Sequence, residues 1–165
     1  PEYDRLQSAF HQTCRDDLYA AIDALPVPPG GHALDAPCGD GFYARRLMTR
    51  VARLTLVDAN PAYLNLAKQA VADPPSGVRV EVLEGDAYAL PFADATFDLV
   101  WCAQSLISLD DPRRALAEFA RVTKPGGRLA VLESDEYHHV LLPLPVSLEV
   151  AIQTAVLTAS RARFG

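Results

Sequence analysis

The chain of 165 residues has few cysteines, no long apolar run and no excess of positive charge. Its cysteines, Cys14, Cys38 and Cys102, are odd in number and far apart, which favours neither a disulfide framework nor a paired metal site. A reducing, cytoplasmic setting is therefore the expectation. No apolar segment approaches the roughly 18–20 residues of a membrane span, and no signal-like segment opens the sequence. We therefore expect no membrane partner and no bound metal.

The charge balance is acidic, with 15 Lys and Arg against 21 Asp and Glu and a formal net charge of −6. Such a balance argues against a surface dedicated to nucleic acid, so we expect no nucleic-acid partner. Half of the residues are hydrophobic and 22% are charged, which is ordinary for a globular protein and excludes a disordered or fibrous chain. The length suits one domain with a true hydrophobic core.

Segments of helical and of strand character alternate along the chain. Apolar residues recur every three or four positions in the expected helices, whereas short apolar runs bounded by turn residues mark the strands. This alternation predicts a doubly wound, Rossmann-like α/β fold with a mostly parallel sheet, at least five strands and helices on both faces. A ligand is then expected beyond the carboxyl ends of the strands. We expect helices over residues 2–25, 41–53, 61–72, 111–124 and 146–163, and strands over 32–36, 54–57, 78–83, 96–102 and 128–133.

A glycine-rich turn joins the first expected strand to the second helix. Its Gly39-x-Gly41-x-x-Ala44 pattern matches the dinucleotide fingerprint, and Asp58 ends the next strand, where an acid would bind ribose hydroxyls. The pattern alone therefore allows a nicotinamide or flavin oxidoreductase.

Two carboxylates at this turn, Asp35 and Asp40, help to discriminate between ligands. Beside a pyrophosphate they would cost electrostatic energy, whereas they suit a ligand with an amino group or a positive charge. S-adenosylmethionine has an ammonium and a sulfonium group and no phosphate. The alternative is that both acids merely cap the turn and the helix that follows it.

The segment from 33 to 133 resembles the class I S-adenosylmethionine-dependent methyltransferases. Residues 34–41, LDAPCGDG, are similar to the first motif of that family, except that Pro37 stands where the family usually has glycine. The later motifs are resembled, in the same order, by residues 57–61, 84–92, 94–102 and 111–127. The resemblance implies in-line methyl transfer from S-adenosylmethionine to a small-molecule acceptor, with alignment and exclusion of water as the main contribution of the protein. A non-catalytic domain that binds the same cofactor is a third interpretation.

The same resemblance gives roles to individual residues. Asp58 would accept hydrogen bonds from both ribose hydroxyls, Asp86 would accept one from the adenine amino group, and the Ala87 amide would reach a ring nitrogen. Gln104 would contact the methionine part. The full set of expected cofactor-binding residues is Asp35, Ala36, Pro37, Cys38, Gly39, Asp40, Gly41, Asp58, Ala59, Asn60, Gly85, Asp86, Ala87, Cys102, Ala103 and Gln104.

No catalytic residue follows from the sequence. The N-terminal helix, which contains His11, resembles the cap that such enzymes lay over the cofactor, and His138 and His139 follow the fifth strand on the substrate side. A histidine at either place would be able to take a proton from the acceptor, although a packed or exposed histidine is the default interpretation. The methylated atom, whether O, N, C or S, stays open.

The length acquires a second meaning from the resemblance. The expected domain divides into a cap helix with a linker (1–31), a cofactor-binding core (32–133) and a substrate-side loop with a helix (134–165). The sheet of the family usually continues with two further strands, which we expect to be missing here. The sequence is then either a fragment of a longer methyltransferase or a chain that covers the free sheet edge by forming a homodimer.

Overall fold

The computed structural model describes residues 2–28 and 30–133. Pro1–Leu132 forms one compact unit and Glu133–Gly165 a second, and the fold below is that of the first unit. The helix expected over 146–163 lies outside the described residues. So does the region after it, where two further strands of the sheet are expected to be missing. Among the described helices, none is both long enough and apolar enough to cross a membrane.

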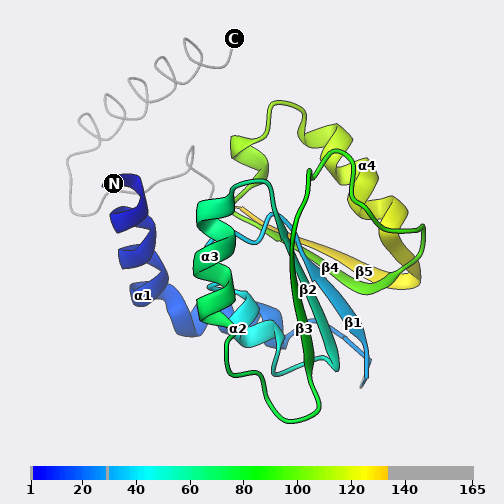
Figure 1. Ribbon diagram of the computed structural model, residues 1–165, viewed down its shortest axis with the longest axis horizontal. Coiled ribbons are helices and arrows are strands. Elements are labelled where there is room, and N and C mark those ends of the chain that lie inside the picture. The colour runs from blue at the N-terminus through cyan, green and yellow to red at the C-terminus, as the bar shows by residue number, and fades with distance from the viewer. Residues whose placement is uncertain (1, 29, 134–165) are drawn as a thin grey trace, which may run out of the picture. The chain divides into compact units, whose positions relative to one another are not determined.

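A five-stranded parallel sheet forms the centre of the first unit, with the strand order β3-β2-β1-β4-β5 (Figure 1). The chain runs outward from β1 to β3 and then returns to place β4 on the other side of β1. In sheets of this kind, ligands bind at the carboxyl ends of the strands where the order reverses. The strands are β1 (His32–Asp35), β2 (Arg53–Asp58), β3 (Arg79–Glu84), β4 (Phe97–Ala103) and β5 (Thr123–Leu132).

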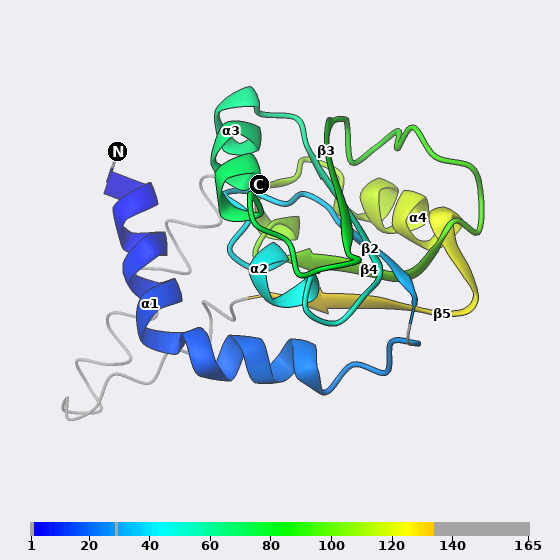
Figure 2. The same ribbon diagram turned by 60° about the horizontal axis from the view of Figure 1, so that its bottom comes forward.

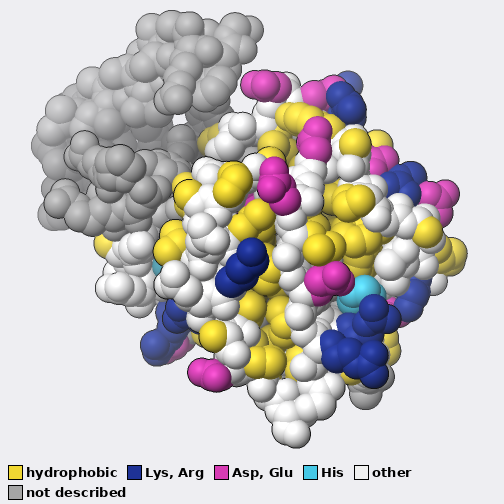
Figure 3. Space-filling view, viewed as in Figure 1, with side chains coloured by type: hydrophobic (Ala, Val, Ile, Leu, Met, Phe, Trp, Pro, Cys, Tyr) yellow, Lys and Arg dark blue, Asp and Glu magenta, His cyan; other side chains and the backbone are white. Residues whose placement is uncertain are grey.

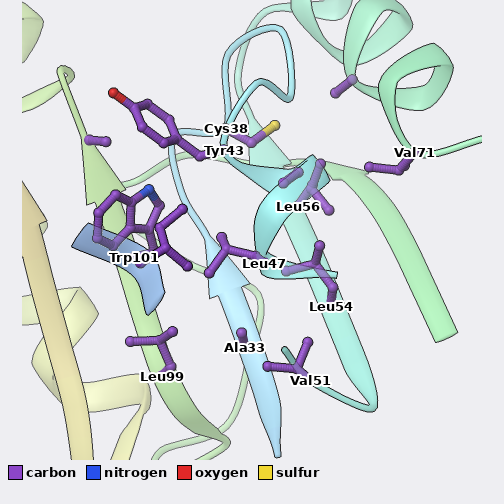
Figure 4. Close-up of a cluster of buried hydrophobic side chains, with 14 of the residues drawn as sticks. Ala33, Cys38, Tyr43, Leu47, Val51, Leu54, Leu56, Val71, Leu99 and Trp101 are labelled. Carbon is purple, nitrogen blue, oxygen red and sulfur yellow. The ribbon is translucent and has the colours of Figure 1, made fainter. Parts of the chain in front are cut away.

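Helices cover both faces of the sheet, as Figures 1 and 2 show. Ala33 and Trp101 face one apolar cluster (Figure 4), whereas Leu34 and Val100 face the other, because successive strand residues point to opposite sides. Side chains of α1, α2 and α3 complete the first cluster, and those of α4 complete the second. The predicted doubly wound α/β fold is thus confirmed. The helices are α1 (Glu2–Asp23), α2 (Ala44–Leu47), α3 (Pro61–Ala70), the 3₁₀ helix η1 (Leu106–Ser108) and α4 (Pro112–Val122).

Two helices begin where the sequence predicts, each with a side-chain cap followed by proline. The Asn60 side chain accepts a hydrogen bond from the Ala62 amide at 2.9 Å, and Asp111 accepts one from the Arg114 amide at 3.0 Å. Both caps satisfy amide groups that a helix leaves without internal partners.

The element α2 is much shorter than the helix expected over 41–53. Gly41 has a φ of +78°, which no helix accommodates, so the helix begins after the turn. At the other end, the amides of Thr49 and Arg50 donate to carbonyls three residues back, which is 3₁₀ geometry rather than α-helical geometry. β5 also differs, since it begins at Thr123, ahead of the expected 128–133, and pairs with β4 through a register shift.

Candidate functional site

One cavity, called here the main cavity, has a volume of about 570 Å³. It lies at the carboxyl ends of β1, β2, β3 and β4, where the strand order predicts a ligand. Its walls come from the turn after β1, the start of α3, the segment after β3, the segment around η1 and one residue of α1. The lining residues are Gln7, Ala36, Pro37, Gly39, Val57, Asp58, Ala59, Asn60, Pro61, Tyr63, Gly85, Asp86, Ala87, Tyr88, Gln104, Ser105, Ser108 and Leu109.

Asp58 organises the centre of the main cavity. Its Oδ2 accepts a hydrogen bond from the Gly39 amide at 2.9 Å, and its Oδ1 accepts one from the Asn60 amide at 2.8 Å. The residue is 7% exposed, so its carboxylate is nearly enclosed yet reaches the cavity wall. Because each carboxylate oxygen has a second acceptor position, both remain able to bind a ligand hydroxyl.

The glycine turn approaches the main cavity through Gly39, whereas Gly41 packs against α3. Both have positive φ angles, +52° and +78°. A methyl group on Gly41 would lie 2.9 Å from the Ala67 Cα, but one on Gly39 would meet nothing within 4 Å. The first glycine thus keeps the cavity open, and the second allows close packing of the turn on a helix. The Ala36–Pro37 peptide bond in the same turn is cis.

Many of the predicted cofactor-binding residues line the main cavity, whereas the others do not. Asp40 instead lines a second cavity, and its Oδ1 accepts a hydrogen bond from the Phe42 amide at 3.0 Å, as the capping interpretation requires. Those that line the main cavity are Ala36, Pro37, Gly39, Asp58, Ala59, Asn60, Gly85, Asp86, Ala87 and Gln104. Those that do not are Asp35, Cys38, Asp40, Gly41, Cys102 and Ala103.

Asp35 is a buried carboxyl group directly behind the turn. Burial first, and then the charges of Asp58 and Asp40, raise its pKa well above the ordinary range. Its Oδ2 is buried without a hydrogen-bond partner among the described residues. Three acids therefore surround the turn. The charges of Asp58 and Asp40 favour a cationic ligand such as S-adenosylmethionine at this turn over an anionic one.

The segment after β3 forms the far end of the main cavity. Asp86 Oδ1 accepts a hydrogen bond from the Tyr88 amide at 2.8 Å, which closes a short turn, and Ala87 is buried beneath it. The Gly85 amide donates to the Asp58 carbonyl at 3.1 Å and so joins this segment to β2. The predicted adenine-binding segment and the predicted ribose-binding acid are therefore held together by backbone contacts.

Several lining residues escaped the sequence analysis. Gln7 reaches the main cavity only because α1 packs over the sheet, and Ser105 and Ser108 only because the chain turns back at η1. Tyr63 follows the cap of α3 and had no signal beyond its place near Asn60. None of these positions belongs to a recognisable motif, since each depends on how distant elements pack.

The cysteines do not form a reactive site. Cys38 and Cys102 are buried, and burial raises the pKa of the Cys38 thiol far above its ordinary value, so the thiol stays protonated. Among residues 2–28 and 30–133, no group of His, Cys, Asp and Glu is arranged to hold a metal ion.

Of the three histidines considered as catalytic candidates, the structure describes His11. His11 does not line the main cavity; it lines the second cavity, of about 310 Å³, between α1 and the residues after the glycine turn. His138 and His139 lie outside the described residues. No catalytic role follows for any of the three from these positions.

Basic side chains gather at the opposite end of the sheet. Arg53 and Arg79 are register partners at the start of β2 and β3, and Figure 3 shows Lys and Arg side chains gathered at the lower right. In contrast, the lining of the main cavity described above contains no Lys, Arg or His, and its charged members are Asp58 and Asp86. The cavity is therefore suited to a cation and not to a phosphate.

Fold and site together define a Rossmann-like domain with an acidic cavity at the carboxyl ends of its strands. Residues 34–131 match the family described as methyltransferase domain, and the chain belongs to this family. The expected S-adenosylmethionine cofactor is thereby confirmed as that of the family.

Individual relatives agree with this classification. Over 112 residues, the chain is 36% identical to the demethylmenaquinone methyltransferase of Renibacterium salmoninarum, which covers 68% of this chain and 45% of the relative. The structure of an S-adenosylmethionine-dependent methyltransferase, possibly for histamine, from Thermotoga maritima has a TM-score of 0.61 at 29% identity, covering 79% and 56% of the two chains. That of the 4+2 cyclase SpnF has a TM-score of 0.64 at 32% identity, covering 73% and 45%. The chain thus spans about half the length of the curated relatives it matches.

Proposed function

We propose that the protein is an S-adenosylmethionine-dependent methyltransferase acting on a small molecule. The observation that carries the proposal is the charge of the main cavity: among the described residues, its lining has two carboxylates, Asp58 and Asp86, and no basic side chain. A sulfonium with an ammonium group is attracted to such a site, whereas the pyrophosphate of NAD or FAD is repelled. The oxidoreductase alternative loses support for this reason.

The described residues would divide the cofactor between them. Asp58 would accept the ribose hydroxyls, Asp86 and Ala87 would contact the adenine, and the turn at Gly39 with Gln104 would hold the methionine part. When bound, the cofactor supplies a methyl group activated by the adjacent sulfonium. The protein then has to align the acceptor and exclude water, for which the segment around η1 and the α1 wall are suitably placed.

The acceptor is proposed from the relatives. The Renibacterium salmoninarum enzyme is named a demethylmenaquinone methyltransferase, so we take demethylmenaquinone as the acceptor and infer methylation at a ring carbon of its reduced form. Such a carbon is activated by the ring hydroxyl. A base takes the hydroxyl proton as the carbon attacks the methyl group, and the hydrogen on the methylated carbon is then lost while the ring oxygen is reprotonated, which restores the aromatic ring. A nucleic-acid acceptor is disfavoured because the described lining of the cavity offers no cation to a phosphate. The cytoplasmic setting and the homodimer stay predictions, and light scattering of the purified chain tests the latter.

Binding and transfer are tested in two steps. S-adenosylhomocysteine should raise the melting temperature by several degrees at 1 mM, and NAD⁺ should leave it unchanged. Stabilisation by NAD⁺ alone would overturn the proposal. Tritiated S-adenosylmethionine is then incubated with demethylmenaquinol, and label in the organic phase is the expected result. If label appears instead in a different small molecule from a metabolite extract, the protein is still a methyltransferase but acts on that molecule.

A second candidate is a domain that binds S-adenosylmethionine without transferring its methyl group. The similarity to a cyclase shows that this fold is also found in a protein named for a different reaction. Tight binding of S-adenosylhomocysteine without transfer to any acceptor in the extract would favour this candidate.

A further inference from the structure

His11 forms a buried polar contact between α1 and the end of the sheet. The residue is 3% exposed, and its ring stacks on Phe42 with centroids 4.0 Å apart and an interplanar angle of 12°. The His11 and Tyr43 rings are close to perpendicular, with centroids 5.5 Å apart. From Gln7 onward, where α1 side chains are described, His11 is the first buried one.

A shared acceptor joins three elements at this point. The His11 Nε2 lies 2.8 Å from the Gln104 Oε1, and the Tyr43 hydroxyl donates to the same oxygen at 2.8 Å. Because an amide oxygen only accepts, His11 donates through its Nε2–H. Figure 4 shows the Tyr43 hydroxyl pointing out of the apolar cluster. Gln104 therefore holds both α1 and the segment that follows the glycine turn.

Gln104 is itself part of the main cavity wall. It follows the end of β4 with a φ of +52°, and its amide donates to the Leu132 carbonyl of β5 at 2.7 Å. Gln7 lies four residues before His11, hence on the same side of α1, and it lines the same cavity. The His11 hydrogen bond thus fixes the part of α1 that forms a wall of the main cavity.

The carboxyl-terminal half of α1 is held by different contacts. Asp23 forms ion pairs with Arg46 and Arg50, and Ile22 is buried in the first apolar cluster. Between the halves, the Thr13 hydroxyl donates to the Ala9 carbonyl, a bond that often bends helices, and Figure 2 shows α1 bent. The two halves of α1 are therefore held by separate sets of contacts.

We propose that the hydrogen bond from His11 to Gln104 is a latch that holds the amino-terminal half of α1 over the main cavity. The inference rests on the proposed function, since the ligand that the latch retains is S-adenosylmethionine or its product. His11 is a positioning residue that acts through Gln104. Closure and ligand binding favour each other, because the ligand contacts the wall that the latch keeps in place.

The test uses the full chain and three variants. His11→Phe keeps a ring on Phe42 but has no donor, His11→Gln restores an N–H donor, and Gln12→Ala is the control on the exposed side of the same helix. Trypsin cleavage after Arg5, identified by mass, reports the undocking of the amino-terminal half of α1. Stopped-flow and calorimetric titrations with S-adenosylhomocysteine report the dissociation rate and Kd.

A lost hydrogen bond between neutral groups changes an equilibrium by about threefold to tenfold. We expect His11→Phe to raise the ligand-free cleavage rate and the dissociation rate of S-adenosylhomocysteine by this factor, with His11→Gln and Gln12→Ala near the wild type. Wild-type values for His11→Phe in both measurements would overturn the latch. If circular dichroism shows that His11→Phe is unfolded, His11→Leu replaces it. Wild-type protein that does not bind S-adenosylhomocysteine would overturn the proposed function, but ligand-free cleavage would still decide the latch.

Discussion

The Gly39 amide donates a hydrogen bond to the Asp58 Oδ2 at 2.9 Å, which ties the glycine turn after β1 to the last residue of β2. The other oxygen of the same carboxylate accepts from the Asn60 amide at the start of α3. One acid thereby sets the positions of two walls of the main cavity before any ligand binds. The proposed ribose contact and the shape of the site thus depend on the same side chain.

Replacing Asp58 by Asn should therefore affect both folding and binding. An amide nitrogen cannot accept, so one of the two backbone donors loses its partner, at a cost of about 1.5–3 kcal/mol for a bond to a charged group. We expect the Kd for S-adenosylhomocysteine to rise at least about tenfold by calorimetry, and the melting temperature to fall. Glu84→Gln is the matched control, because Glu84 pairs with Asp58 in register but is exposed and lies outside the main cavity. Equal affinities for Asp58→Asn and the wild type would remove Asp58 from the site.

The two glycines of the turn should separate folding from binding. In Gly41→Ala, the new methyl group would lie 2.9 Å from the Ala67 Cα at a φ of +78°, so we expect a loss of about 3 kcal/mol in urea unfolding. In Gly39→Ala, nothing lies within 4 Å of the methyl group, so the loss should be about 1 kcal/mol from the backbone conformation alone.

Ligand binding should show the reverse order. The methyl group of Gly39→Ala occupies a wall of the main cavity, so this variant should bind S-adenosylhomocysteine at least about tenfold more weakly, an expectation that follows from the cost of a misplaced group. Folded Gly41→Ala should bind more nearly like the wild type. Equal effects of both substitutions on stability would contradict the packing of the turn on α3.

The sequence was sufficient for the architecture and for part of the site. Several features depend on local chemistry and can be predicted without a structure. These are the apolar runs of the strands, the helix caps Asn60 and Asp111, and the order of the motifs. The early start of β5 depends on pairing with β4. The cavity wall at Gln7 depends on the docking of α1 through His11, which brings together residues 93 positions apart in sequence. Packing between distant elements leaves no periodic pattern in the sequence.

The lowered pKa of His32 predicts that the protein loses stability in acid. Burial first, and then the charges of Arg53 and Lys124, lower its pKa to about 4, although Asp98 opposes the shift. The unfolded chain therefore takes up this proton near pH 6.5 and the folded chain only near pH 4, so stability falls as the pH drops through this window. Urea unfolding monitored by the single tryptophan, Trp101, should show this slope in the wild type and a flatter one in His32→Gln. Identical slopes would exclude His32 as the cause.

The raised pKa of Asp35 predicts the opposite dependence of stability on pH. Because its folded pKa is raised by burial and by two neighbouring acids, the folded chain holds this proton to a higher pH than the unfolded chain does. Stability is therefore lost as the pH rises from about 4 toward the raised pKa. Asp35→Asn removes the ionisation, so the ligand-free variant should exceed the wild type by at least about 1 kcal/mol at pH 8, and the difference should shrink at pH 4.

The same substitution should weaken the proposed cofactor. The ammonium group of S-adenosylhomocysteine would favour ionisation of the Asp35 carboxyl on binding, which an amide cannot undergo. Asp35→Asn should therefore raise the Kd for S-adenosylhomocysteine by about tenfold at pH 8 while raising the stability of the ligand-free protein, a trade-off between function and stability. Glu84→Gln again serves as the control, because Glu84 is exposed and lies outside the main cavity. If Asp35→Asn were less stable than the wild type at pH 8, the buried carboxyl would have to be a structural hydrogen-bonding group rather than a ligand-directed one.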